Sequence, residues 1–368
     1  MKSLMGVINL DHEHDFLHEL TYFRCGAAVP FAGRYRLIDF VISNMVNSKI
    51  TDVAVFARRK YRSLMDHLGT GDPWDLDRNR GGLFILPPDW NDPTDISKGD
   101  LQHFHNNRDF FDRGQASYVL ISGSQHVCNI NYDEVFQYHL EKDADVTVIY
   151  KNVEILEDEH KQCHKLEYDL NGRITSINND YDNHNVSLDM IIIKKDLLMN
   201  LVDDCIVHGN DHFFRDGIMH RVHHLKVYGY EYKGFHAVVN SLESFYKHNL
   251  ALLNPNVYRQ LFSREQLIFT KVKDEPPAKY LTHANVQNSL IANGCVIDGK
   301  VENSIIFRGV NIEKGAVIKN SIIMQRCDIK ENAHVENVIL DKDITLSKER
   351  VLIGAVELPY VVAKRKVM

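Results

Sequence analysis

The first candidate for chemistry in this sequence is an acidic, histidine-containing loop near the N-terminus. Asn9 is followed by Leu-Asp-His-Glu-His-Asp, which ends at Asp15. A loop that binds phosphate needs glycines, so that backbone N–H groups can approach the anion, and it usually carries cations. Three carboxylates about 4 Å from a triphosphate would each oppose it by about 1 kcal/mol in water, and by about 4 kcal/mol at an effective dielectric of 20. The loop therefore argues against nucleotide chemistry here.

Two groups of histidines have a spacing that could suit a metal. In the acidic loop His18 lies four residues after His14, and a second group comprises His220, His223 and His224. Imidazole and carboxylate groups at such spacings can ligate zinc. We favour a solvated loop for the first group and a surface position for the second, and we expect no metal bound by this chain.

Three arginines close together in the sequence could bind an anion. Arg24, Arg34 and Arg36 follow the acidic loop. Guanidinium groups bind phosphorylated molecules in a bidentate manner, but they form ordinary salt bridges equally well. Both interpretations stay open on the residues alone.

The elements around these residues predict an α/β domain. The acidic loop lies between an apolar strand at 4–8 and a segment at 35–46 with apolar residues at helical spacing, which is how nucleotide-binding α/β units begin. Strands and helices then alternate, which predicts a mixed, mainly parallel sheet with helices on both faces. We expect strands at 51–58, 117–122, 144–151, 186–194 and within 226–239, a hairpin at 165–177, and helices at 61–68, 99–114, 133–142, 196–202 and 242–253.

The last part of the chain is repetitive. Asn-Ser-Leu-Ile at Asn288 recurs in similar form at Asn303, Asn320 and Asn337, and aliphatic residues six positions apart lie between these motifs. This pattern is typical of a left-handed parallel β-helix, here of about four coils. We therefore divide the chain into an α/β domain at 1–254, a linker at 255–280 and a β-helix domain at 281–368.

Composition excludes several classes of function. Of the 368 residues 44% are hydrophobic and 25% are charged, and the net charge of -7 argues against nucleic acid as a partner. No stretch is apolar enough for a membrane span or a leader peptide. The six cysteines form no C-x-x-C pair, so we expect reduced thiols in a cytoplasmic protein.

Taken together, the two parts resemble the ADP-glucose pyrophosphorylases, also called glucose-1-phosphate adenylyltransferases. The segment Ala28-Val-Pro-Phe-Ala-Gly-Arg-Tyr-Arg-Leu-Ile-Asp-Phe is very similar to the family's A-V-P-F-G-G-K-Y-R-L-I-D-F. Further matching residues are Ser43-Asn44, Asn47-Ser48, His67-Leu-Gly, Trp74-Asp-Leu-Asp, Phe110-Phe-Asp-Arg, Tyr118-Val-Leu-Ile and Ser244-Phe-Tyr. The resemblance covers nearly the whole chain, and it implies a nucleotidyltransferase (GT-A-like) domain followed by the β-helix.

The departures from the family pattern fall on the positions that carry its chemistry. By this resemblance, a glycine-rich loop is replaced by Asp11 to Leu17, and a family lysine falls on Gly26. The two aspartates that hold Mg²⁺ fall on Gln125 and Val238. The lysine that grips glucose 1-phosphate falls near Asp180, and the family's G-T-A-D-A becomes Gly99-Asp-Leu-Gln-His. Mg²⁺ prefers carboxylate ligands, so we expect no catalytic residue and no cofactor in this chain.

The resemblance thus implies a non-catalytic regulatory subunit that pairs with a catalytic homologue, most plausibly in a heterotetramer, in which the partner uses Mg²⁺. A phosphorylated effector would bind Arg24, Arg34 and Arg36 together with Lys364, Arg365 and Lys366. One alternative is an autonomous but weak adenylyltransferase with a rearranged active site. Another is an acyltransferase that uses the β-helix, in whose repeats the histidine is His334.

Overall fold

The computed structural model describes residues 3–11, 17–88 and 99–368, which form two compact units. The first unit comprises the N-terminal strand, Phe40–His236 and Arg264–Phe269. The second comprises the described part of His14–Asp39, Ala237–Ser263 and Thr270–Met368. The units are therefore interleaved along the chain, because a short N-terminal segment belongs to the unit that holds the β-helix.

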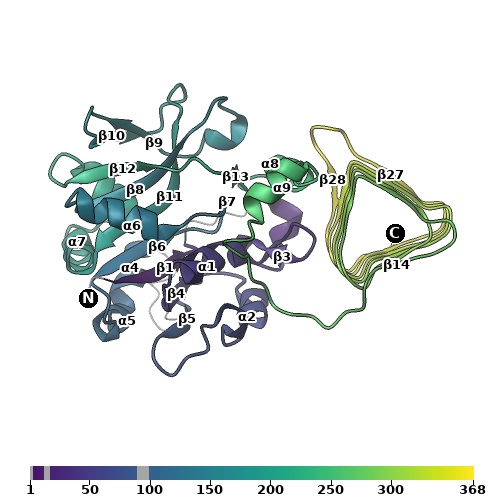
Figure 1. The fold of residues 1–368 in the computed structure, drawn as a ribbon, viewed down its shortest axis with the longest axis horizontal. Coiled ribbons are helices and arrows are strands. Elements are labelled where there is room, and N and C mark those ends of the chain that lie inside the picture. Colours follow the sequence, from purple (N-terminus) through teal and green to yellow (C-terminus); the bar gives the residue numbers. More distant parts are fainter. Residues whose placement is uncertain (1–2, 12–16, 89–98) are drawn as a thin grey trace. The chain divides into compact units, whose positions relative to one another are not determined.

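The first unit is built on a mixed sheet (Figure 1). Its centre is β1 (Leu4–Asn9), which pairs in parallel with β4 (Asp52–Phe56) and β6 (Tyr118–Ser122). The strand β11 (Asn185–Lys194) runs antiparallel to β6 and to β8 (Val146–Asn152). The remaining described strands of this sheet are β5 (Gly82–Leu86), β9 (Lys165–Tyr168), β10 (Ile174–Asn178) and β12 (Val227–Glu231).

Apolar residues on both faces explain why these strands lie inside. Every residue of β6 is buried, as is most of β11, and helices cover the sheet as expected for a mainly parallel arrangement. The α-helices of this unit are α1 (Leu37–Asn47, which begins in the second unit), α2 (Arg62–Leu68), α4 (Asp100–Asn106), α5 (Arg108–Arg113), α6 (Tyr132–Glu141) and α7 (Lys195–Val207). Shorter turns of helix lie at η3 (Asp72–Trp74), η4 (Asp158–His160), η5 (Phe213–Ile218) and η6 (Met219–Arg221).

Two details of the first unit differ from the sequence-based prediction. The helix expected at 99–114 is divided into α4 and α5, and the side chain of Asn107 between them donates to the carbonyl of His103 at 2.9 Å. The strand β5, in a stretch expected to be loop, pairs in parallel with β4. Among the described helices, none is long and apolar enough to cross a membrane.

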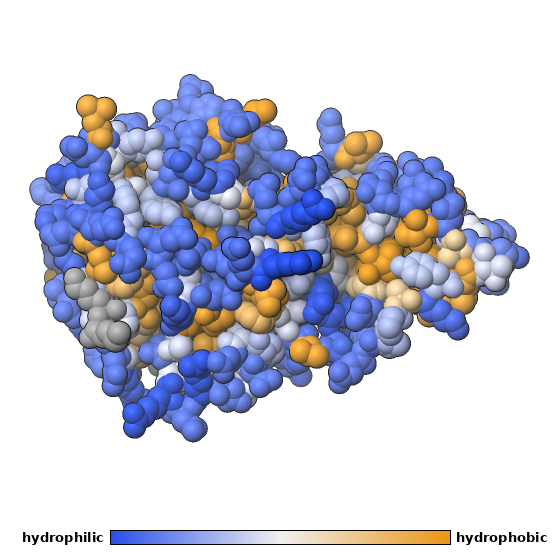
Figure 2. Space-filling model, viewed as in Figure 1, coloured by the Kyte–Doolittle hydropathy of each residue, from blue (hydrophilic) through white to orange (hydrophobic). Residues whose placement is uncertain are grey.

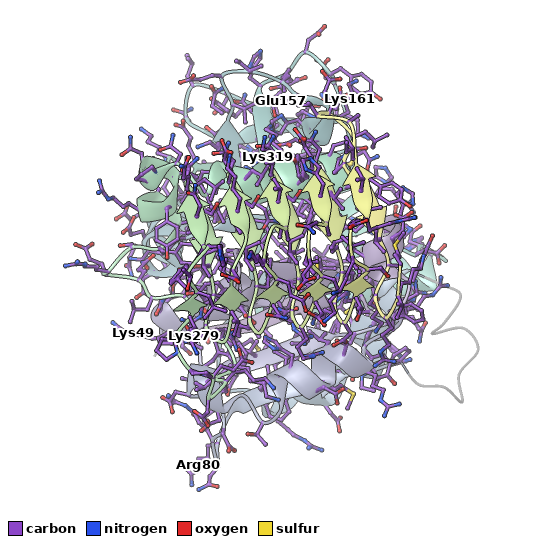
Figure 3. All side chains as sticks on the ribbon, turned by 90° about the vertical axis from the view of Figure 1, so that its right-hand side faces the viewer. Lys49, Arg80, Glu157, Lys161, Lys279 and Lys319 are labelled. Atoms are coloured by element: carbon purple, nitrogen blue, oxygen red, sulfur yellow. The ribbon has the colours of Figure 1, made fainter. Side chains whose placement is uncertain are left out.

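The β-helix of the second unit has five coils. Each of its three faces is a parallel sheet of five strands (Figure 3). The strands are β14 (Lys279–Tyr280), β17 (Val296–Ile297), β20 (Asn311–Ile312), β23 (Asp328–Ile329) and β26 (Thr345–Leu346) on one face; β15 (Asn285–Gln287), β18 (Lys300–Glu302), β21 (Val317–Lys319), β24 (His334–Glu336) and β27 (Val351–Ile353) on the next; and β16 (Leu290–Ile291), β19 (Ile305–Ile306), β22 (Ile322–Ile323), β25 (Val338–Leu340) and β28 (Tyr360–Val362) on the third. The expected four coils were one too few, because the last coil lacks the asparagine motif.

The corners of the coils explain the repeated Asn-Ser motif. Asn288, Asn303, Asn320 and Asn337 all adopt a left-handed backbone conformation, with φ between 40° and 53°. Asparagine tolerates this conformation better than most residues. Next to them, the hydroxyl of one corner serine accepts a hydrogen bond from the backbone N–H of the corner residue one coil later. For example, Oγ of Ser289 accepts from the backbone N–H of Ser304 at 3.1 Å. The motif therefore specifies the turns, and the aliphatic residues fill the interior.

The rest of the second unit consists of short elements. They are η1 (His18–Thr21), η2 (Gly26–Ala28), β2 (Pro30–Phe31), β3 (Tyr35–Arg36), α8 (Leu242–Ala251) and α9 (Pro255–Leu261). Pro255 occupies the first turn of α9, a position that proline tolerates because its nitrogen needs no hydrogen bond there. The stretch 255–261, which the sequence analysis assigned to a linker, is therefore helical. The strand β13 (His236–Val238) spans the division between the units.

Candidate functional site

In the first unit, a buried carboxylate and a buried imidazole lie in contact directly after β1. Asp11 and His103 are both 2% exposed, and the carboxylate lies 3.3 Å from Nδ1 of the imidazole. The other ring nitrogen, Nε2, lies 2.9 Å from the carbonyl oxygen of Leu86, and the ring stacks on Phe56 at 4.3 Å. Both ring nitrogens of His103 are thus in contact with oxygen atoms of the same unit. The pair lies just after the carboxyl end of β1, where the resemblance implies a phosphate-binding loop.

A second polar pair fixes the start of α4 beside the same strand. The side chain of Asn9 donates to Asp100 at 2.8 Å, and the other carboxylate oxygen of Asp100 accepts from the backbone N–H of Phe213 at 2.8 Å. Gly99 precedes this helix, and a Cβ at that position would lie 2.1 Å from the carbonyl oxygen of Asp211. The stretch that the resemblance sets against the family's G-T-A-D-A segment thus makes its hydrogen bonds within the first unit.

At the carboxyl end of β6 lies a chain of three polar side chains. Nδ1 of His126 lies 2.9 Å from Nε2 of His236, with the two rings stacked, and Nε2 of His126 lies 3.4 Å from Asp189. Asp189 occupies an irregularity in the pairing of β11 with β8 and has a φ of 50°. A non-glycine residue with positive φ is uncommon and is associated with functional sites. The sequence analysis identified none of these three residues.

The residues at the metal positions implied by the resemblance do not fit Mg²⁺. Val238 is 1% exposed and offers only hydrocarbon, and Gln125 offers a neutral amide. Mg²⁺ is held chiefly by carboxylates and substrate phosphates, so this donor set cannot replace the two family aspartates. Across the described residues, no group of three or more His, Cys, Asp and Glu is arranged to hold a metal ion.

The other two family positions are also without catalytic groups. Gly26 lies in η2 of the second unit, and Asp180 is exposed in the loop after β10. The carboxylate of Asp180 accepts from the backbone N–H of Asp182 at 3.1 Å, so it serves a local turn. The expectations for His12, Glu13, His14 and Asp15 lie outside the described residues.

The second histidine group lies at the surface. His220, His223 and His224 are exposed. The first and last of them, together with His208, line an open cavity of about 680 Å³ beside α7. The carboxylates of this cavity already have partners, since Asp204 pairs with Arg221 and Asp216 with Arg215. Hydrogen bonds from Arg215 hold the pKa of Asp216 at about 2.

A cluster of basic residues lies within the second unit. Arg24 is 2% exposed, donates from Nε to the carbonyl of Leu20 at 2.7 Å, and forms an ion pair with the fully buried Asp341. Arg24 is therefore a structural member of the cluster whose charge is already paired. The other oxygen of Asp341 accepts from the backbone N–H of Lys342 at 2.7 Å.

Lys342 brings a further charge into this cluster. Burial, together with the charges of Arg36 and Arg24, lowers the pKa of Lys342 to about 6. Lys364 stands over the ring of Phe23 at 4.7 Å, and burial, followed by Arg24 and Arg365, lowers its pKa as well. Burial is the main cause of the lowered pKa of both lysines, and the neighbouring guanidinium groups add to it.

Three more basic residues proposed from the sequence, namely Arg34, Arg365 and Lys366, lie at the surface. Arg34 is exposed, and its carbonyl accepts from Arg308 at 3.2 Å. Burial and the neighbouring Arg34 lower the pKa of Arg308. Arg365 and Lys366 are exposed. The structure thus brings Arg24 and Arg36 together with Lys342 and places Arg34 beside Arg308.

Lys342 and Asp341 were missed by the sequence analysis, although a signal existed. The strand register places Asp341 one coil above Met324 and two coils above Phe307, where the chain has apolar residues. A carboxylate at a repeat position that is otherwise apolar indicates a buried charge with a partner.

Comparisons with known proteins agree with this architecture. Residues 17–162 match the family model described as nucleotidyl transferase, and residues 276–357 match the model described as GlmU-like, C-terminal hexapeptide. The chain is 41% identical to the glycogen biosynthesis protein GlgD of Bacillus subtilis over 98% of this chain and 96% of that protein. It is 42% identical to GlgD of Geobacillus stearothermophilus, over 86% and 83% of the two chains. It is 29% identical to a glucose-1-phosphate adenylyltransferase of Clostridium novyi, over 86% and 84%.

Proposed function

Because this chain belongs to the family of the glycogen biosynthesis protein GlgD and the glucose-1-phosphate adenylyltransferases, we propose that it is a regulatory subunit with no turnover of its own. It would act in the cytoplasm beside a catalytic homologue that makes ADP-glucose for glycogen. The observation that carries this proposal is the buried Asp11–His103 pair at the end of β1, where a catalytic relative needs a loop that accepts phosphate.

The chemistry of adenylyl transfer explains why the Asp11–His103 pair, in place of a phosphate-binding loop, would prevent turnover. An oxygen of glucose 1-phosphate attacks the α-phosphorus of ATP, and negative charge builds on the phosphoryl oxygens. A carboxylate at Asp11 opposes that charge, and its partner His103 is already bound to it and to the carbonyl of Leu86. Loss of one stabilising group typically costs about 10²- to 10³-fold in rate, and here the loop, a lysine and both metal ligands are replaced together.

The partner proposed is a catalytic homologue, in a heterotetramer. The last coil of the β-helix supports a docking surface, because β27 is the final strand of its sheet and exposes Val351 and Ile353 at 57% and 62%. Val356, Leu358 and Tyr360 are exposed close by in the chain. Figure 2 shows hydrophobic residues gathered over the β-helix. An open strand edge and exposed apolar side chains favour association with another chain.

The regulatory ligand proposed is a phosphorylated small molecule. Four of the basic residues proposed from the sequence suit anion binding. Arg36 and Lys364 are partly exposed, and Arg34 and Arg365 are exposed. Arg24 is a structural part of the site, because its charge is paired with Asp341. Guanidinium and ammonium groups gathered on one unit attract phosphate oxygens and bind them with charge-assisted hydrogen bonds.

The test of this role uses the chain together with a catalytic homologue. The two chains would be co-expressed, purified through a tag on one of them, and assayed for pyrophosphate release with and without phosphorylated effectors. We expect co-purification, a higher rate than that of the catalytic chain alone, and a changed effector response. Failure to associate, or a rate and effector response unchanged by this chain, would contradict the proposal.

A matched pair of variants tests the anion site in that assembly. Replacing Arg36 and Lys364 together by glutamine should weaken the effector response while the complex still forms. Lys348→Gln is the control, because Lys348 lies on the same β-helix with its ammonium paired to Glu331 at 2.8 Å. Equal effects of both replacements would argue against the site.

A further inference from the structure

Lys342 is surrounded by positive charge from several elements of the second unit. Arg24 reaches it from the segment after η1, Arg36 from β3, and Arg326 from the turn before β23. The carboxylate that faces it is Asp341. Lys364, near Arg24, Asp341 and Asp343, adds a further cation to the same cluster. Arg365 also acts on Lys364, so the cluster holds six basic side chains against two carboxylates.

Both carboxylates already have other partners. Asp341 forms its ion pair with Arg24 and accepts from the backbone N–H of Lys342, not from its ammonium group. Asp343 binds Arg326 through both oxygens, at 2.7 and 3.0 Å. Among the described residues, no carboxylate lies within 4.0 Å of Nζ of Lys342. Within the described part of the second unit, the ammonium form of this lysine thus lacks a direct counter-ion.

The position of Lys342 in the coils gives it access to a ligand. The register of β19, β22 and β25 stacks Arg308, Gln325 and Lys342 at the same corner of three successive coils. All three are only half-buried. Oε1 of Gln325 has no hydrogen-bond partner among the described residues. The corner therefore places a guanidinium group and an amine group along one line of the β-helix.

Resting on the anion site proposed above, we propose that Lys342 couples this site to protons: its amine is neutral in the free protein and takes up one proton when a doubly charged oxyanion binds beside Arg36 and Lys364. The bound dianion supplies the counter-charge that Asp341 and Asp343 do not. The proton comes from solvent and binds Nζ, and no covalent bond changes. The pKa of about 6 for the free protein supports this direction.

The coupling has a consequence for regulation. Anion binding that requires the protonated lysine weakens as pH rises, by about tenfold per pH unit above the pKa of about 6 in the free protein. A phosphorylated effector would then act more strongly in acidic than in alkaline conditions. The site would respond to effector concentration and pH jointly.

The experiment measures proton uptake on anion binding to the purified full-length chain. Sulfate is the probe, because its own charge does not change near neutral pH. Isothermal titration near pH 7.5 in buffers of different ionisation enthalpy gives the number of protons taken up per sulfate bound. We expect a value close to one, and an affinity that increases as pH is lowered towards 6.

Three variants distinguish proton uptake by Lys342 from the effect of a positive charge at that position. Lys342→Arg keeps a permanent cation, so it should bind sulfate with little pH dependence and no proton uptake. Lys342→Gln should bind more weakly, again without proton uptake. Lys348→Gln, which removes an exposed lysine paired with Glu331, should behave like the unmodified chain.

The outcomes distinguish this inference from the proposal on which it rests. Saturable sulfate binding without proton uptake, or uptake that persists in Lys342→Arg, would overturn the coupling and leave the anion site standing. Absence of saturable sulfate binding at every pH would overturn both the site and the coupling. The regulatory role itself is judged separately, by the effect of the chain on a catalytic homologue.

Discussion

Arg24 and Asp341 form a buried ion pair that joins the segment after η1 to the fourth coil of the β-helix. The two residues are 317 positions apart in the chain. Burial of both charges makes the pair sensitive to removal of either member, because the remaining charge loses its direct ion-pair partner.

Removing one member of this pair should destabilise the second unit strongly. We expect Asp341→Leu to lower the free energy of unfolding by about 3–5 kcal/mol, because Arg24 is left as an uncompensated buried charge. Adding Arg24→Met to that variant should restore most of the loss. Urea denaturation gives the values. The control is Arg326→Met, which breaks the exposed pair with Asp343 and should cost under about 1 kcal/mol. Equal costs for the two pairs would contradict this account.

The pH dependence of stability should carry the signature of Lys342. The unfolded chain keeps the proton of this lysine up to its ordinary pKa of 10.5, whereas the folded chain releases it above about 6. Between these values the unfolded state binds more protons, so folding stability rises with pH, by at most about 1.4 kcal/mol per pH unit. Denaturation from pH 6 to 9 in buffers without phosphate or sulfate measures the slope. In Lys342→Met the slope should be smaller, and an unchanged slope would contradict the assignment.

The first turn of α4 should tolerate no side chain at Gly99. A Cβ there would lie 2.1 Å from the carbonyl oxygen of Asp211, so we expect Gly99→Ala to lower the midpoint of thermal unfolding, at a cost of about 1–3 kcal/mol. Gly123→Ala is the matched control, because its Cβ would meet only the carbonyl of Asn9 at 3.9 Å. If Gly99→Ala left the midpoint of thermal unfolding unchanged, this turn would be able to move. The packing described for α4 would then be wrong.

The exposed apolar side chains of the last coil should matter for association. Val351→Lys with Ile353→Lys should reduce co-purification of a catalytic homologue at least tenfold, because burying two lysines costs more than removing two aliphatic contacts. His334→Lys with Glu336→Lys, one coil earlier on the same face, is the control. Circular dichroism checks that both variants fold. Retention of the partner by the Val351 and Ile353 variant would exclude this surface.

Much of the fold follows from local patterns in the sequence. The apolar runs of β6 and β11 and the helical spacing in α1 depend on near neighbours in the chain, so the mixed, mainly parallel sheet could be predicted. The β-helix could be predicted for the same reason, since each coil repeats its corner asparagine and its inward aliphatic residues. The fifth coil was missed because its corner is built without that motif.

The site could be predicted only in part, because its contacts join distant positions. The sequence indicated that the carboxylate of Asp11 would repel phosphate. Its partner His103 lies 92 residues away in the chain, so no local pattern predicts this contact. Asp189 contacts His126 from an irregularity in the pairing of β11 with β8, which no local pattern in the sequence predicts. Arg24 was expected to bind a ligand, and the structure shows it paired with Asp341, a contact that no spacing in the sequence reveals.

The central claim is tested most directly by the turnover of the chain itself. Purified from a host that lacks its own glucose-1-phosphate adenylyltransferase, the chain would be incubated with ATP, glucose 1-phosphate and Mg²⁺, both alone and in complex with a catalytic homologue whose metal-binding aspartates are replaced by alanine. We predict no pyrophosphate release above the protein-free background in either sample, and a raised rate when the homologue is intact. Sustained ADP-glucose synthesis by the chain alone, or by the complex with the inactivated homologue, would contradict the account.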